Sequence, residues 1–198
     1  MLKSRLWLLV AVAVIGLSAC KKNETSVTLN DSEASSVNNA VAASSDKAVA
    51  TTTQTLSSPD DKLSIVVDGN FVNKMDDAED WVRQEDLDTL MLLQHDEKTN
   101  ITLIANDLGP LKIEPKNYFA KLVDDLNKQT SISSLDVGMA TENRINYHMS
   151  HADNGVVLNE SCVVMVANNN LYSVCASSDT AKIDALAAAL KTININSH

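Results

Sequence analysis

Apolar and polar positions alternate along the second half of the chain with the period of β-strands. Residues 62–67 alternate in this way and include Ile and Val, so they predict a strand that turns at Asp68-Gly69. Apolar runs at 87–94 and 100–106 flank a polar loop at 95–99, which predicts a hairpin. Further strands are expected at residues 134–141, 144–150, 156–167, 170–176 and 193–195.

Two segments instead repeat apolar residues with the period of an α-helix. Pro115 suits the first turn of a helix, because proline has no N–H to lose there. The first helix is predicted by the spacing i, i+3, i+4 and i+7 of Phe119, Leu122, Val123 and Leu126. The second helix has the same spacing at Ile183, Leu186, Ala187 and Leu190, with Ser178 or Asp179 as its predicted N-cap. The order of elements predicts an α+β fold, an antiparallel sheet with helices packed on it.

The N-terminus has a different pattern, which is typical of an export signal. Lys3 and Arg5 precede an uncharged apolar run at 6–16, and small residues then lead to Cys20. The run is shorter than the ~20 apolar residues that span a bilayer. Leu17-Ser18-Ala19-Cys20 resembles the end of a bacterial lipoprotein signal peptide. This resemblance implies cleavage before Cys20, diacylglycerol on its thiol and acylation of the new N-terminus; an uncleaved anchor and ordinary secretion are the alternatives.

The anchor predicts a location in the bacterial envelope. Two or three acyl chains hold a protein on a membrane permanently, so we expect a membrane protein that faces the periplasm. Lys21, where enteric inner-membrane lipoproteins tend to have aspartate, favours the outer membrane. The net charge of −10 becomes −12 when Lys3 and Arg5 leave with the signal. So acidic a chain is not expected to bind nucleic acid or to dock electrostatically on anionic lipid.

Composition divides the chain into three predicted parts. Residues 1–19 are the signal peptide. Residues 20–58 contain the lipidated cysteine and a linker rich in Ser, Thr, Asn and Ala, which has no aromatic residue and is predicted to be disordered. Residues 59–198 have the length and apolar content of a single globular domain.

Cys162 and Cys175 are predicted to form a disulfide. If the turn between their strands is Asn168-Asn169, Ala167 pairs with Asn170 and the two cysteines fall directly opposite each other. Such a pair brings Cα atoms to ~4.5 Å, within the range of a disulfide. An exported protein meets an oxidising compartment. Two buried thiols are the main alternative, and a catalytic thiol is less favoured because the chain has no Cys-x-x-Cys or Cys–His arrangement.

An acidic stretch at 76–88 surrounds Trp81 and predicts a short helix or a loop. Its carboxylates Asp76, Asp77, Glu79 and Asp80 are interpreted first as a solvated face. A docking face for a basic partner is the second interpretation. A divalent cation site is the third, although the stretch lacks the central glycine of a calcium-binding loop.

The histidines do not predict a metal site. His148 and His151 are three apart at a predicted strand end, where they point to opposite faces. We expect them in surface or strand-end roles, and His95 solvated in a hairpin loop. The chain also lacks a Gly-x-Ser-x-Gly nucleophile motif and a glycine-rich phosphate loop. We therefore predict no catalytic residue, no metal and no cofactor.

Several segments of the domain carry a family resemblance. They are residues 61–65, the hairpin at 90–106, the helix at 115–128, the strand pair at 156–176 and the terminal helix at 180–190. Together with Cys20 and the polar linker, they resemble the DcrB family of bacterial lipoproteins, a branch of the PsbP-like α/β sandwich fold. The chain departs from that pattern at Asp68-Gly69, where the family often has a proline-bearing loop, and in having Cys162 and Cys175.

The resemblance implies a non-enzymatic envelope protein, an adaptor or assembly factor with an envelope protein as partner. Two other classes stay open. One is a small-ligand or lipid-binding module that uses a cleft between sheet and helix. The other is an unrecognised hydrolase.

Overall fold

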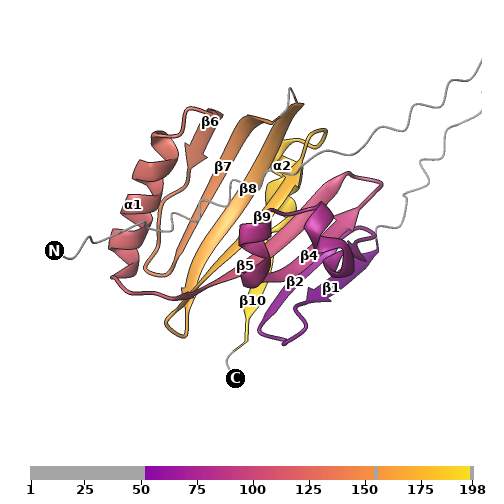
Figure 1. The fold of residues 1–198 in the computed structure, drawn as a ribbon, viewed down its shortest axis with the longest axis horizontal. Coiled ribbons are helices and arrows are strands. Elements are labelled where there is room, and N and C mark those ends of the chain that lie inside the picture. Colours follow the sequence, from indigo (N-terminus) through magenta and orange to yellow (C-terminus); the bar gives the residue numbers. More distant parts are fainter. Residues whose placement is uncertain (1–51, 154–155, 197–198) are drawn as a thin grey trace, which may run out of the picture.

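A computed structural model of the chain describes residues 52–153 and 156–196, which form ten strands, two α-helices and two 3-10 helices within those ranges (Figure 1). The strands are β1 (Thr53–Ser57), β2 (Leu63–Asp68), β3 (Val72–Asn73), β4 (Leu90–Asp96), β5 (Ile101–Pro110), β6 (Ile132–Val137), β7 (Arg144–Asp153), β8 (Val156–Ala167), β9 (Asn170–Ser178) and β10 (Thr192–Ile195). The helices are η1 (Met75–Asp80), η2 (Gln84–Thr89), α1 (Pro115–Asn127) and α2 (Ile183–Ala189).

The strands form two antiparallel sheets. The larger sheet has seven strands in the order β3-β4-β5-β9-β8-β7-β6, and the smaller has three in the order β1-β2-β10. The predicted α+β class with antiparallel strands is confirmed at this level, but the strands divide into two sheets.

The seven-stranded sheet is covered on both faces. Leu103 and Ile104 are neighbours in β5, so their side chains point to opposite faces, and both are buried. Leu103 belongs to a core with Leu63 of the small sheet and Leu186 of α2. Ile104 belongs to a core under η1 and η2, and farther along the same face α1 packs over β7, β8 and β9. Because both faces are covered, consecutive residues along most of β4, β5 and β9 are buried instead of alternating between buried and exposed positions.

The two α-helices begin differently, α1 with a proline in its first turn and α2 without a side-chain N-cap. α1 has Pro115 in its first turn and buries Phe119, Leu122 and Leu126, as the apolar spacing predicts. α2 starts later than predicted, at Ile183, and its N-cap makes no side-chain hydrogen bond. The Ser178 hydroxyl instead accepts the N–H of Ala181 at 2.9 Å, which stabilises a turn before the helix. The prediction that Ser178 or Asp179 caps this helix is wrong.

β1 corrects the predicted domain boundary. Thr53–Ser57 was assigned to the linker, but it pairs along its length with β2, and Leu56 lies opposite Ile65 and is buried. A short edge strand needs only one buried apolar side chain when its partner is already in the core, so the Ser/Thr-rich composition was misleading. The ordered domain begins before residue 59.

The β8–β9 hairpin has the predicted turn. Asn168 and Asn169 have φ of 51° and 62°, the left-handed conformation that a two-residue type I′ turn requires and that asparagine tolerates. Ala167 therefore pairs with Asn170, and Cys162 lies opposite Cys175. Their Cα atoms are 4.2 Å apart and the two sulfurs are bonded, which confirms the disulfide.

The N-terminal predictions lie outside the described residues. These are the signal peptide at 1–19, Cys20 with its lipid and nearly all of the linker. Within 52–153 and 156–196, no helix has the length and apolar character needed to cross a bilayer.

Removing the disulfide should weaken the domain without abolishing its fold. The crosslink joins residues 13 apart in sequence, and closing so short a loop stabilises a protein by about 3 kcal/mol or less in the chain-entropy model. We expect Cys162→Ala/Cys175→Ala to lower the free energy of unfolding by about this amount in urea titrations. A reducing agent should destabilise the wild type similarly and leave the variant unchanged. Free alkylation of both thiols in unreduced, denatured protein would contradict the crosslink.

Candidate binding site

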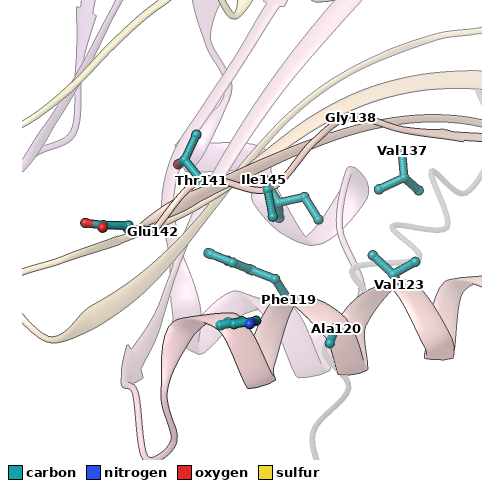
Figure 2. A pocket seen from close by; sticks show the side chains of 10 residues that line it. Phe119, Ala120, Val123, Val137, Gly138, Thr141, Glu142 and Ile145 are labelled. Carbon is teal, nitrogen blue, oxygen red and sulfur yellow. The ribbon is translucent and has the colours of Figure 1, made fainter.

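An open apolar groove lies between α1 and the β6–β7 hairpin (Figure 2). Its volume is about 730 Å³, within the range of pockets that hold small organic ligands. α1 contributes one wall, and the end of β6, the loop after it and the start of β7 contribute the other. The lining residues are Lys116, Phe119, Ala120, Val123, Val137, Gly138, Ala140, Thr141, Glu142 and Ile145.

The helical wall follows from the periodicity of α1. Phe119 and Val123 are one turn apart and therefore share a side of the helix, with Ala120 beside them. Phe119 is almost fully buried against the sheet, whereas Ala120 is exposed. Val123 and Val137 face each other across the groove, and Ile145 lies over Phe119 (Figure 2). The small side chain at Ala120 leaves the space that makes this side of α1 hollow.

The opposite wall is a loop whose backbone is held by its own hydrogen bonds. The Gly138 N–H donates to the carbonyl of Asn146 at 2.9 Å, and the Thr141 N–H donates to that of Arg144 at 2.8 Å. The Thr141 hydroxyl also donates to the Arg144 carbonyl, at 3.1 Å. At Gly138 and Thr141 the wall therefore has donors that are already bonded within the hairpin. Met139, between the lining residues Gly138 and Ala140, is 94% exposed.

Lys116 is the positively charged residue among those that line the groove. Lys121 of α1 pairs with Asp125 at 2.7 Å, and Lys128 pairs with Asp124 at 3.5 Å. Lys116 forms no ion pair within the part of the chain that the structure describes. The other charged lining residue, Glu142, directs its carboxylate away from α1 (Figure 2).

The groove rests on the crosslinked part of the sheet. Phe119 and Ile145 belong to the same buried cluster as Cys162 and Cys175. Tyr147, two residues beyond Ile145 on β7, lies opposite Cys162. The disulfide therefore fixes the strands beneath the groove.

The carboxyl group of Glu160 is buried on β8, two residues before Cys162 of the disulfide. Glu160 shares with Leu158, Cys162 and Val164 the face of β8 that α1 covers, and it is fully buried. His151 Nε2 is 3.7 Å from its carboxylate, an electrostatic contact too long for a hydrogen bond. Burial raises the pKa of Glu160, and His151 opposes this rise. Burial, and next the Glu160 charge, raise the pKa of Tyr147 on the adjacent strand.

Two histidines lie deeper than predicted. His95 belongs to β4, where its Nδ1 is 3.0 Å from the Thr102 hydroxyl and the Trp81 ring lies 4.9 Å away, centroid to centroid. Burial, and next Lys74, lower the pKa of His95. His151 is also buried and lies near the end of β7, so of the surface or strand-end roles expected for it the surface role is wrong. These positions were missed because β4 and β7 continue beyond the predicted strand ends.

His148 lies on the opposite face of β7 from His151, as the strand periodicity predicts. Its Nδ1 is 3.1 Å from the Ser161 hydroxyl on β8. Across the described ranges, His, Cys, Asp and Glu side chains nowhere gather in threes at metal-binding distances.

The predicted acidic residues form a separate surface. Asp76, Asp77, Glu79 and Asp80 are all exposed, on or at the end of η1. In the described segments none of the four forms an ion pair, whereas Arg83 nearby pairs with Glu85 and Asp86. η1 lies over β4, near one edge of the seven-stranded sheet, and the groove lies at the other edge. The structure does not bring the acidic surface and the groove together.

The groove itself was not located from the sequence, which offered only a general cleft between sheet and helix as an alternative. A signal was present, because Ala120 lies beside Phe119 and Val123 and widens the apolar side of α1. Glu160 was also missed, although it occupies a core-facing position in the alternation of β8.

No protein-family description matches the chain. No curated protein matches it either.

Replacing Glu160 by Gln tests the buried carboxyl. Burial raises the Glu160 pKa above the ordinary 4.5, so the wild type should lose stability as the pH rises above that value. Glu160→Gln does not titrate there. Its melting temperature should exceed that of the wild type at about pH 8 and converge with it near pH 4.5.

Thermal unfolding measured across this pH range checks the expectation, and Glu142→Gln, at an exposed glutamate, is the matched control. A difference that widens toward low pH would contradict the assignment.

Proposed function

We propose that this chain is a lipid-anchored, non-enzymatic protein of the bacterial envelope, facing the periplasm and acting as a tethered interaction or assembly factor. Its sequence resemblance to DcrB-like lipoproteins of the PsbP-like fold supports this class. The observation that carries the proposal is the apolar groove between α1 and the β6–β7 hairpin, which is the surface we assign to binding.

The chemistry of the groove favours recognition. Burying apolar surface is the main driving force for association, and the lining is dominated by aliphatic and aromatic side chains. Concave sites lined mainly by apolar side chains with a few polar groups are where proteins commonly bind ligands, and this groove has that character. Lys116 adds one charge that can orient an occupant.

The rigidity of the site supports the same function. α1 is packed through Phe119, and the other wall is pinned by backbone hydrogen bonds and by strands that the disulfide crosslinks. A preformed site spends little free energy on ordering when it binds. A tether at Cys20 would hold such a site near the membrane and its partners.

Changing Cys20 to Ala tests the anchor. We expect the wild type in the membrane fraction even at high salt, because acyl chains and not charges hold it. Cys20→Ala should lose the lipid and, when exported through a cleavable non-lipoprotein signal, appear in the soluble periplasmic fraction with unchanged thermal stability. Membrane retention of this variant after a high-salt wash would contradict lipidation at Cys20.

A photocrosslinking experiment tests the groove. The crosslinking amino acid p-benzoylphenylalanine replaces Ala140, an exposed lining residue, in the full chain in intact cells. We expect a covalent adduct that falls at least about tenfold with Ala120→Trp, since the indole would fill the hollow. Ala188→Trp places the same side chain at an exposed alanine of α2 and should leave the adduct unchanged. An adduct insensitive to Ala120→Trp would contradict binding in the groove.

The acidic surface on η1 is the second candidate, favoured by four exposed carboxylates without ion-pair partners among the described residues. The crosslinking experiment separates the two surfaces. In a further arm, Asn or Gln replaces Asp76, Asp77, Glu79 and Asp80. If the adduct is lost only when these four acidic residues are replaced, the docking site is the acidic surface and not the groove.

A further inference from the structure

We infer that the groove binds a free long-chain fatty acid, with the hydrocarbon chain along α1 and the carboxylate at Lys116. The inference rests on the proposed function, which assigns binding to this groove, and adds the chemical class of the ligand.

The apolar walls suit a hydrocarbon chain. A peptide backbone that enters an apolar groove must replace its hydrogen bonds to water, and each unsatisfied group costs free energy. On the loop wall, the Gly138 N–H, the Thr141 N–H and the Thr141 hydroxyl already donate to carbonyls inside the hairpin. An acyl chain needs no such partners and gains from every methylene that it buries.

The charges favour a single anionic head. Lys116 is a lining residue whose ammonium group has no carboxylate partner in the described ranges, unlike Lys121 and Lys128 on the same helix. A carboxylate at Lys116 would complete an exposed ion pair at the edge of the apolar walls, which orients the ligand and adds little to its affinity.

The margins of the groove suit a ligand that arrives from a membrane. Met139, which lies between the lining residues Gly138 and Ala140, is 94% exposed. Apolar side chains left in water at the rim can contact an acyl chain before it is fully enclosed. A lipid anchor at Cys20 would keep the groove close to that source.

The test uses the full chain in its own membranes and palmitic acid that carries a diazirine on its chain. After irradiation, mass spectrometry should locate the label in peptides from α1 and from residues 137–145. Ala120→Trp should reduce labelling at least about tenfold, and Ala188→Trp should not. Unlabelled fatty acids from octanoic to tetradecanoic acid should compete better as they lengthen, by up to roughly fourfold per methylene.

Lys116→Gln tests the head group without filling the groove. The wild type should prefer the diazirine fatty acid to the corresponding fatty alcohol, and Lys116→Gln should lose most of this preference. Lys121→Gln, at a lysine already paired with Asp125, should keep it. An unchanged preference in Lys116→Gln would overturn the assignment of the carboxylate.

The outcomes separate this inference from the proposed function. Equal labelling of the groove by a diazirine phospholipid would show that the source is membrane lipid, which contradicts a free fatty acid. If the fatty acid does not label the groove but the adduct at position 140 persists, the inference fails and the proposed function stands. If neither forms, both fail.

Discussion

The register of the β8–β9 hairpin is the constraint on which the rest of the structure depends. The turn at Asn168 and Asn169 sets Cys162 opposite Cys175, and the disulfide then locks that pairing. Strand periodicity sends the cysteines toward α1, and Val163 and Val174 toward α2 and the small sheet. A slip of one residue would exchange these faces and leave both cores without matching side chains.

The groove follows from how α1 meets the edge of this sheet. α1 packs its buried side over β7, β8 and β9, and the loop after β6 rises beside its outer flank. Since Ala120 is small at this flank and the loop bonds back onto its own hairpin through Gly138 and Thr141, neither wall closes the gap. A binding surface thus lies directly against the most strongly constrained part of the domain, while the acidic surface lies toward the other edge of the sheet.

Features set by local rules could be predicted from the sequence. The Asn-Asn turn, the cysteine pairing and the apolar face of α1 depend on residues close in the chain. β1, the burial of His95 and His151, and the groove depend on distant segments. β1 exists because β2 offers an edge, His95 is buried because Trp81 covers it, and the groove needs α1 and the β6–β7 loop in place. The spacing of residues along the chain does not predict contacts between such distant segments.

If the groove binds a ligand or partner, it is occupied in the envelope. Carbene footprinting detects such occupancy by comparing the side-chain labelling of the full chain in intact membranes with that of the purified protein. Val123 and Val137, which line the groove, should be protected in membranes and labelled after purification. Val72 and Val157, exposed apolar residues that do not line the groove, should be labelled equally in both. Equal labelling of the groove residues in both states would contradict the account.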